Sequence, residues 1–492
     1  MAFWFLAPLS IPSANTVLHH GAAAVKAPPG SATSALYATL DSNFQRDWST
    51  DFKPLQPGIQ PPAQTVSVIF AAHGEHQYIE RTMASLYENT PREISEEGSV
   101  SFGLLEVILI DDASEPPLLP LVRDKYPEII VRRHETQQGL IRSKTHGASI
   151  ASGDIIVFLD AHVKTEPGWL PPLLRRISEN YKKVVVPLIP ILDGESWTVK
   201  EKGVGIKMMF SWGLQFNWFE DGNDDVPIMS GGLLAMSRRW WFESGEYDTG
   251  MRLWGAENIE QSIRIWLCGG EIQVARDSFV SHVFRPHFPY KIDDSQVMIN
   301  KARTVEAWFD DWKERVYNGD PNLRHFIHRT GDISSRLKLK EDLKCKPFSF
   351  FVERFKPIFQ RRGMLDDNLF VIKDSKSGEC VQMVGKEWHL GQCDKRSIQQ
   401  RFSGEGGALR IGPDCVDSNS ALQEKLNQPI LVFHCQDYIQ GLSASQTWSV
   451  EDGKLLWGGG LCAAVDFGDR VLKFRGCDDA VTQHSFEKDS VK

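Results

Sequence analysis

Two apolar segments of this chain end in acidic residues, and this pattern restricts the possible fold more than any other feature. Leu105–Asp112 is an apolar run that ends in two aspartates, and Asp154–His162 contains an apolar run that ends in Asp-Ala-His. Short apolar runs of this kind are typical of strands that are buried on both faces of a parallel sheet. Such sheets bind their ligands at the carboxyl ends of the strands. The sequence therefore predicts an α/β domain in which the two acidic strand ends lie at one edge.

The alternation of strands and helices begins at Thr65. The pattern predicts a strand at Val66–Phe70, a helix at Tyr78–Glu88, a strand at Ile129–Val131 and a helix at Leu140–Ala151. Strands that alternate with helices build βαβ units with parallel strands. The chain has 492 residues, which is more than one core usually holds, so we expect two or three domains.

Asp160 and His162 form a candidate metal site. In an extended backbone, residues two apart project to the same side, so the carboxylate and the imidazole could hold one ion between them. This donor set suits Mn²⁺ and related divalent ions. The alternative is that Asp160 caps the following turn and that His162 is an ordinary loop histidine.

The net charge argues against some classes of partner. The formal net charge of −9 argues against a nucleic-acid-binding protein, and it leaves no large basic field for anionic membranes. An anionic small ligand would need a metal ion or local arginines.

The N-terminal region differs in composition from the rest. Met1–Ile11 is apolar, but it is much shorter than a membrane span and has no basic flank. Residues 13–64 are rich in Ala, Ser and Pro, as flexible linkers are. We expect residues 1–64 to form an N-terminal segment and a flexible stem.

The eight cysteines are distributed unevenly. None precedes Cys268, and six lie between Cys380 and Cys477. No Cys-x-x-Cys spacing indicates zinc, so local bridges are the simplest interpretation. Disulfides imply an oxidising compartment; the alternative is reduced thiols in a cytosolic protein. The expected pairs are Cys268 with Cys345, Cys380 with Cys393, Cys415 with Cys435, and Cys462 with Cys477.

The C-terminal part contains three loosely similar blocks. Each block has a cysteine pair and ends in a glutamine followed by an aromatic residue. A repeat of roughly forty to fifty residues indicates a symmetric repeat architecture. We expect the aromatic side chains in a shared core rather than at a ligand. The three endings are Gln400–Phe402, Gln446–Trp448 and Gln483–Phe486.

Seven motifs in a fixed order carry a resemblance to a known family. They are Ile110–Asp112, Gly139–Arg142, Leu159–His162, Ser230–Leu233, Trp254–Asn258, His282–Arg285 and Cys345–Phe348. From Val66 to its C-terminus the chain resembles the polypeptide N-acetylgalactosaminyltransferases, which start mucin-type O-glycosylation. Each motif alone is weak, and their order makes the resemblance specific.

The resemblance implies a fold, a reaction and a compartment. The fold class is α/β, with a GT-A type nucleotide-sugar transferase domain at residues 65–357 and an all-β, ricin-like β-trefoil lectin domain at residues 358–492. The reaction is transfer of GalNAc from UDP-GalNAc to Ser or Thr hydroxyls of proteins or glycopeptides, with Mn²⁺ as cofactor and retention of configuration. The family is usually anchored in the Golgi membrane by one N-terminal helix. Residues 1–12 cannot span a bilayer, so the resemblance implies an incomplete start.

For the metal, the resemblance implies three ligands. His282 joins Asp160 and His162, and Mn²⁺ would bridge to the diphosphate as a Lewis acid. Taken alone, His282 would be assigned a structural role at a strand end. Arg285 would add a second cation, because a guanidinium matches phosphate geometry; the alternative is a surface arginine.

For the donor, the resemblance places Glu257 beside the sugar and Trp254 against the donor. An acid in the first turn of a predicted helix also stabilises the positive helix end, which is the alternative role of Glu257. Attack is expected on the face from which the leaving group departs, so the β-phosphate can accept the proton and Glu257 need not be a nucleophile. Tyr290 matches a mobile loop that closes over the donor. The other expected donor-binding positions are Asp112, Arg142, Ala161, Gly231 and Gly232, the glycines because backbone without a Cβ can approach a ligand closely.

The chain departs from the family pattern at several positions. Ala161 replaces the usual Ser between two metal ligands, and Ala71 stands where the family often has a Thr near uracil. These departures affect turnover and nucleotide contacts more than metal binding. In the trefoil, only Asp417 keeps the acid that follows the first cysteine of a repeat by two residues, so we expect carbohydrate binding there; the alternative is a purely structural trefoil.

Two other functions stay open on the same scaffold. One is a catalytically weak or silent lectin that binds glycoproteins, and the other is a transferase that uses another UDP-sugar.

Overall fold

The computed structural model describes residues 64–90, 102–201, 207–285, 292–362 and, with short gaps, 364–491. The expected stem lies outside these ranges up to residue 63, as do Tyr290 and Cys435. Among the described residues, no helix combines the length and the apolar character needed to cross a membrane.

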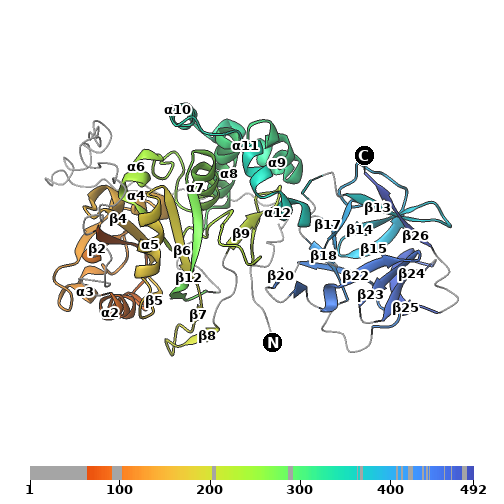
Figure 1. The fold of residues 1–492 in the computed structure, drawn as a ribbon, viewed down its shortest axis with the longest axis horizontal. Coiled ribbons are helices and arrows are strands. Elements are labelled where there is room, and N and C mark those ends of the chain that lie inside the picture. The colour runs from red at the N-terminus through yellow and green to blue at the C-terminus, as the bar shows by residue number, and fades with distance from the viewer. Residues whose placement is uncertain are drawn as a thin grey trace, which may run out of the picture. The chain divides into compact units, whose positions relative to one another are not determined.

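The first part of the chain is built around one mixed sheet (Figure 1). The strands of this sheet are β1 (Gln64–Ala72), β2 (Phe102–Asp111), β3 (Ile130–Arg133), β4 (Ile155–Asp160), β5 (Val163–Thr165), β6 (Lys183–Leu188), β7 (Ile191–Leu192), β8 (Val199–Glu201), β11 (Leu234–Ser237) and β12 (Glu271–His282). Their order is β3-β2-β1-β4-β11-β6-β12-β7-β8, and β5 pairs with β12. Because β1 pairs in parallel with both β2 and β4, the predicted α/β class and its parallel strands are confirmed.

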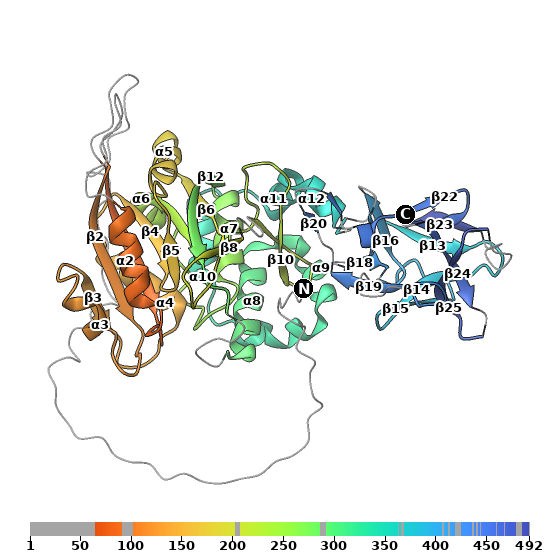
Figure 2. The same cartoon turned by 90° about the horizontal axis from the view of Figure 1, so that it is seen from below.

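Strand β1 is buried from both sides. Val68 and Phe70 belong to one apolar cluster and Ile69 to another, because successive side chains of a strand point to opposite faces. Helix α4 (Leu140–Ile150) packs on the face of Ile69, whereas α2 (Ile79–Asn89) contributes to the other cluster and lies beside β5 (Figure 2). Helices thus cover both faces, as a parallel sheet requires.

The remaining elements of the first part are mostly helices, some between the sheet strands in sequence and the others after β12. The α-helices are α3 (Leu119–Arg123), α5 (Pro171–Glu179), α6 (Arg238–Glu243), α7 (Glu257–Leu267), α8 (Asp294–Trp308), α9 (Lys313–Gly319), α10 (Ser334–Asp342), α11 (Phe348–Arg354) and α12 (Lys356–Arg361). Two 3-10 helices, η1 (Asp310–Trp312) and η2 (Pro321–Arg329), and a hairpin of β9 (Lys207–Phe210) and β10 (Phe216–Phe219) complete it.

Strand β12 changes its partner along its length. Its first part pairs in parallel with β6, and after a register shift its last residues pair antiparallel with β5. A bulge of this kind redirects the end of a strand. In the resulting register His282 lies opposite Val163, so the end of β12 reaches the segment that follows β4.

The C-terminal part is an all-β unit with its own core. Strand pairings run from β13 through β16, β17, β18, β19, β15 and β14 back to β13, which closes a ring of strands, as in a β-trefoil. Phe402, Trp448 and Phe486 are buried in one apolar cluster, so the expectation that the aromatic residues of the three blocks share a core is confirmed. The elements are β13 (Phe370–Asp374), β14 (Cys380–Val384), β15 (Glu387–Gly391), β16 (Phe402–Glu405), β17 (Ala408–Ile411), β18 (Asp414–Asp417), β19 (Leu431–His434), β20 (Asp437–Tyr438), β21 (Gly441–Leu442), η4 (Ala444–Gln446), β22 (Trp448–Glu451), β23 (Lys454–Trp457), β24 (Leu461–Asp466), β25 (Val471–Gly476) and β26 (Phe486–Ser490).

The expected disulfides agree with the structure wherever both partners are described. The seven described cysteines are all disulfide-bonded, and Cys415 is one of them although its expected partner Cys435 is not described. The three bridges with both ends described are Cys268–Cys345, Cys380–Cys393 and Cys462–Cys477.

The expected division between residues 357 and 358 stays a prediction. Helix α12 crosses this point, and its residues Ile358 and Phe359 belong to an apolar cluster of the first part. The first strand of the trefoil begins at Phe370.

Candidate metal and donor site

The polar ends of three neighbouring strands meet at one edge of the sheet. In the register of these strands, Ala71 of β1 lies beside Asp160 of β4, and Ala72 lies beside Asp111 of β2. The prediction that the two acidic strand ends share one edge is therefore confirmed.

Asp160, His162 and His282 come together at this edge. One possible ligand atom from each lies within 4.8 Å of the others, and all three side chains are partly exposed. Nε2 of His282 is 3.4 Å from Oδ2 of Asp160, and the two imidazole centroids are 4.6 Å apart. One carboxylate and two imidazoles form a donor set that suits Mn²⁺. The side chains present therefore fit the expected ion.

A lysine lies on the inner side of Asp160. Lys144 of α4 has no exposed surface, and its Nζ is 3.4 Å from Oδ1 of Asp160. Burial by itself would raise the pKa of Asp160, but Lys144 and the two histidines outweigh it and hold this pKa well below its usual range. Asp160 is therefore ionised at neutral pH, as a metal ligand must be.

Glu75 lies beside His162. Its Oε1 is 3.2 Å from Nδ1 of His162, and its side chain is buried. The backbone carbonyl of Glu75 also accepts hydrogen bonds from the amides of Tyr78 and Ile79, where α2 begins. A carboxylate next to a ligating imidazole orients the ring and makes it a better ligand.

Gly231 and Gly232 make room for other parts of the protein. A Cβ on Gly232 would lie 2.4 Å from Oδ2 of Asp160, and one on Gly231 would lie 2.9 Å from Cβ of Asn258. Gly231 has a φ of 82°, a conformation that glycine adopts without strain. The close approach expected of these glycines is thus made to Asp160 and to α7, and their contact with the donor stays a prediction.

Helix α7 begins with a turn in an unusual conformation. Leu253, Gly255 and Ala256 have φ angles of 59°, 103° and 68°; each non-glycine residue of this kind costs about 1–3 kcal/mol. Oε2 of Glu257 accepts a hydrogen bond of 2.7 Å from the amide of Gly255. Trp254 lies within this turn and is half-buried. The expected donor-contacting residues Trp254 and Glu257 are therefore held by one strained, hydrogen-bonded turn.

Asn300 of α8 fastens the same turn. Its buried side chain donates towards the carbonyl oxygens of Arg252, Trp254 and Gly255, at 2.9, 3.4 and 3.0 Å. Because every one of these contacts is to backbone, Asn300 sets the course of the chain that presents Trp254.

Glu257 is a buried carboxyl group close to the triad. A Cβ on Gly231 would be 3.8 Å from its Oε1, which places it beside the glycine pair. Burial raises the pKa of Glu257, and the charge of Asp160 raises it further, against the opposing effects of the Gly255 amide and Lys144.

Asp112 organises the loop before α4. Its Oδ1 accepts from the amide of Gln138 at 2.8 Å and lies 2.7 Å from Nδ1 of His134, while its Oδ2 accepts from the amide of Gly139 at 2.8 Å. His134 in turn contacts His146, with 2.9 Å between Nε2 and Nδ1. The carboxylate therefore shapes a turn of the backbone, and its expected contact with the nucleotide stays a prediction.

Gly139 brings the start of α4 against the turn that carries Trp254. Its φ is 88°, and a Cβ there would lie 2.2 Å from Cα of Leu253. Arg142, in the first turn of α4, is half-exposed and donates a 3.1 Å hydrogen bond to Oε1 of Gln138. The regions expected to bind the nucleotide and the sugar are thus in direct contact.

The structure gives fewer contacts for the other residues that are expected at the donor site. Ala161 is buried, and its carbonyl accepts a 3.1 Å hydrogen bond from Oγ1 of Thr82. Arg285 follows β12 and is half-buried. Their roles, and that of Tyr290 outside the described residues, stay predictions.

In the trefoil, Asp417 ends β18 and is buried. Its Oδ2 accepts a 3.2 Å hydrogen bond from Oγ of Ser445. At the corresponding positions, Gln382 accepts from Gln400 at 3.2 Å, and Ala464 is buried. The middle repeat is therefore the one that carries an acid, and its role in carbohydrate binding stays a prediction.

Sequence reasoning missed three buried polar residues around the site: Glu75, Lys144 and Asn300. A signal existed for Lys144, because it shares one helical face with the buried residues Ile141 and Ala148. A charged residue within an apolar stripe is rarely buried without a partner, so the stripe itself indicates that Lys144 has one.

Comparisons with known proteins show which family this chain belongs to. Residues 67–240 match the family described as glycosyl transferase family 2. Polypeptide N-acetylgalactosaminyltransferase 13 of Homo sapiens is 33% identical over 399 residues, which cover 75% of this chain and 68% of that protein. Polypeptide N-acetylgalactosaminyltransferase 4 of Caenorhabditis elegans is 34% identical over 445 residues, which cover 84% and 70%. The matched part covers a smaller share of some other relatives, for example 60% of the length of polypeptide N-acetylgalactosaminyltransferase 13 of Rattus norvegicus.

A solved structure is also similar over most of the chain. The crystal structure of GalNAc-T7 with UDP, GalNAc and Mn²⁺ has a TM-score of 0.56 and 26% sequence identity, and the match covers 87% of this chain and 82% of that one. The fold, the order of the motifs and the extent of the sequence matches lead to one conclusion. The chain belongs to the polypeptide N-acetylgalactosaminyltransferase family.

Proposed function

We propose that this protein transfers GalNAc from UDP-GalNAc to Ser and Thr hydroxyls of proteins, with Mn²⁺ as cofactor. The observation that carries the proposal is the convergence of Asp160, His162 and His282 within 4.8 Å, next to the Gly231–Gly232 turn. The relatives bear the names of enzymes of this activity, and the similar GalNAc-T7 structure contains UDP, GalNAc and Mn²⁺.

The residues of the site have different roles, which follow from their chemistry. Bound Mn²⁺ would offset the negative charge that develops on the diphosphate when the glycosidic bond breaks. Asp160, His162 and His282 hold the ion, and Arg285 adds a cation for the same diphosphate. Ala161 and the glycine pair line the donor, and Tyr290 belongs to the loop that excludes water.

The nucleotide binds at the turn before α4 and the sugar binds at the turn before α7, and these two turns are in contact at Gly139. Asp112 and Arg142 lie on the nucleotide side, and Trp254 and Glu257 on the sugar side. Glu257 orients the sugar, and the Gly255 amide holds its Oε2 at 2.7 Å; because the β-phosphate can accept the hydroxyl proton, Glu257 need not be a nucleophile.

The disulfides support a place in the secretory pathway. Bridges such as Cys268–Cys345 persist in oxidising compartments and are rare in the cytosol. We assign the protein to the Golgi lumen, with attachment to the membrane through a segment that precedes the catalytic domain.

The trefoil supports a second activity, which is binding of GalNAc-containing glycopeptides at Asp417. This carboxylate occupies the end of β18 in the one repeat that keeps an acid, and Ser445 holds its Oδ2 at 3.2 Å.

One experiment tests the transferase proposal against its alternatives. The purified protein is incubated with a Thr-containing peptide, Mn²⁺ and, in separate reactions, UDP-GalNAc, UDP-GlcNAc, UDP-glucose or UDP-galactose, and the peptide mass is measured. We expect a gain of one N-acetylhexosamine with UDP-GalNAc. A gain with another donor alone would reassign the donor, and no gain with any donor, despite binding of glycopeptides, would identify a silent lectin.

A pair of histidine variants assigns the activity to the proposed site. His282→Ala should abolish transfer, whereas His389→Ala in the trefoil, which removes a half-buried histidine beside Glu387, should leave transfer unchanged. Equal activity of the two variants would remove His282 from the ligand set.

A further inference from the structure

Lys144 is a buried cation whose contacts join two parts of the candidate site. It has no exposed surface, and its Nζ lies 2.9 Å from the carbonyl oxygen of Gly231, 3.1 Å from that of Gly232 and 3.4 Å from Oδ1 of Asp160. An ammonium group has three donor hydrogens, so these three acceptors use all of them. A buried charge is tolerated only when it is paired and hydrogen-bonded in this way.

The contacts of Lys144 distinguish the two oxygens of Asp160. Oδ1 faces the ammonium, whereas Oδ2 faces Nε2 of His282 at 3.4 Å. The oxygen on the His282 side is therefore the one available to a metal ion. A carboxylate that offers one oxygen leaves more coordination positions of the ion for a ligand such as a diphosphate.

The same ammonium group also restrains the Gly231–Gly232 turn. Gly232 is packed against Oδ2 of Asp160 so closely that a Cβ would be 2.4 Å away, and Lys144 holds the carbonyls of Gly231 and Gly232. Movement of the turn would therefore disturb the metal ligand, and movement of Asp160 would disturb the turn. Hydrogen-bond and ion-pair networks of this kind can carry coupling between two sites.

We propose that Lys144 is a positioning residue that couples Asp160 to the Gly231–Gly232 turn, and that it thereby adds to the cooperativity with which a nucleoside diphosphate and the divalent cation bind this protein. This inference rests on the proposed function of the site. The ammonium acts through Asp160 and the glycine backbone, and its positive charge also favours an anionic ligand. Positioning and charge attraction both favour nucleotide binding, so loss of Lys144 should weaken nucleotide binding through each of them.

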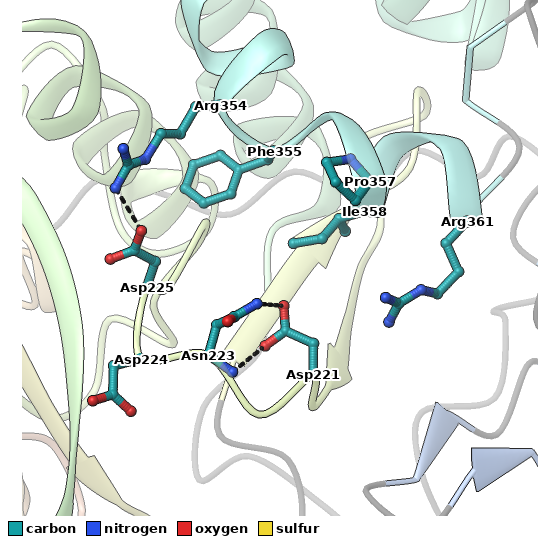
Figure 3. Close-up of a pocket in the computed structure, with 9 residues that line it drawn as sticks. All are labelled: Asp221, Asn223, Asp224, Asp225, Arg354, Phe355, Pro357, Ile358 and Arg361. Carbon is teal, nitrogen blue, oxygen red and sulfur yellow. Dashed lines mark hydrogen bonds and ion pairs between the residues drawn. The ribbon is translucent and has the colours of Figure 1, made fainter.

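Another buried lysine provides a matched control. Lys207 of β9 also has no exposed surface, and its Nζ is 2.5 Å from Oδ1 of Asp221. Asp221 lines a cavity of about 330 Å³ (Figure 3). The other two acids of that cavity are paired as well, Asp224 with Arg276 at 2.8 Å and Asp225 with Arg354 at 2.5 Å. Loss of Lys207 would thus break a buried ion pair without touching Asp160 or the glycine turn.

The test is calorimetric titration of the full chain with UDP at saturating Mn²⁺, and with Mn²⁺ at saturating UDP and without UDP. We expect Lys144→Met to weaken UDP binding by at least about tenfold and to reduce the mutual enhancement of UDP and Mn²⁺ binding to the part that comes from direct contact between the ion and the diphosphate. Lys207→Met should lower the thermal unfolding midpoint while it leaves UDP affinity within about twofold of the wild type.

A second variant guards against loss of the fold. Lys144→Gln keeps a donor for the glycine carbonyls and removes the charge, and we expect it to lower UDP affinity and the coupling as well. If either folded Lys144 variant keeps wild-type UDP affinity and coupling, or if Lys207→Met reduces them equally, the inference is overturned. A wild-type protein that binds no UDP in the presence of Mn²⁺ would overturn the proposed function itself, so the two failures are distinguishable.

Discussion

A methyl group at position 232 would collide with Asp160, one of the three proposed metal ligands. In Gly232→Ala, the new Cβ would be 2.4 Å from Oδ2 and 3.2 Å from Cγ of Asp160. An ordinary contact between such a carbon and an oxygen is roughly 3.3 Å, so the carboxylate or the turn must move by about 0.9 Å. Neither moves easily, because Lys144 holds both Asp160 and the carbonyl of Gly232.

This displacement should cost more in metal binding than in stability. Overpacking of a well-packed region costs about 1–3 kcal/mol, which the protein should tolerate in part. A shift of about 1 Å at a site that needs fixed geometry can cost about 100-fold. We therefore expect Gly232→Ala to fold and to bind Mn²⁺ between about 10- and 100-fold more weakly than the wild type.

The assay is titration with Mn²⁺ by calorimetry, together with thermal unfolding. The control is Gly458→Ala in the trefoil, because the nearest atom to a Cβ there is 3.4 Å away and no positive φ is required. This control should keep both Mn²⁺ affinity and stability. If Gly232→Ala binds Mn²⁺ as tightly as Gly458→Ala does, the placement of Oδ2 against the glycine turn is wrong.

Three further predictions concern other parts of the protein. Gly139→Ala should lower the free energy of unfolding by at least about 2 kcal/mol, since its Cβ would lie 2.2 Å from Cα of Leu253; an unchanged urea midpoint would contradict this. Burial, and then the charge of His134, lower the pKa of His146 from 6.5 to about 4, so the unfolded chain binds more protons in this window and stability falls as pH decreases through it. His146→Gln should reduce this loss by about 1–2 kcal/mol after allowance for partial exposure, and an unaltered pH dependence of urea unfolding would refute the assignment. Asp417→Ala should abolish binding of GalNAc-glycopeptides without changing transfer to naked peptides, and undiminished binding in a calorimetric titration would sink the lectin prediction.

The parallel sheet and its acidic edge could be predicted from the sequence because both follow from short-range patterns. Apolar runs such as Ile155–Leu159 mark buried strands, and the strand direction then puts Asp111 and Asp160 at one edge. The local bridges Cys380–Cys393 and Cys462–Cys477 followed from spacing in the same way, and Cys268–Cys345 was the pair that remained.

The third proposed metal ligand, His282, could not be derived from spacing. His282 reaches Asp160 because β12 shifts register and then pairs with β5, and neither event leaves a local pattern. The resemblance to a known family, not the periodicity, placed His282 in the ligand set.

The roles of several polar residues also depended on the three-dimensional structure. Asp112 was expected to contact the nucleotide, and the structure shows its carboxylate engaged by two backbone amides and by His134. Lys144 was missed because its partners lie on other strands and turns. In both cases the sequence shows a charged residue, and only the tertiary contacts show which groups pair with that charge.

Direct measurement of Mn²⁺ binding tests the central claim, which is that Asp160, His162 and His282 form one metal site. Electron paramagnetic resonance on the full chain should detect one bound Mn²⁺ per wild-type protein and an equal affinity in His389→Ala. His282→Ala should bind more than about 100-fold more weakly, beyond the 10–100-fold typical of an outer-shell partner. Equal Mn²⁺ affinity of His282→Ala and His389→Ala would contradict the account.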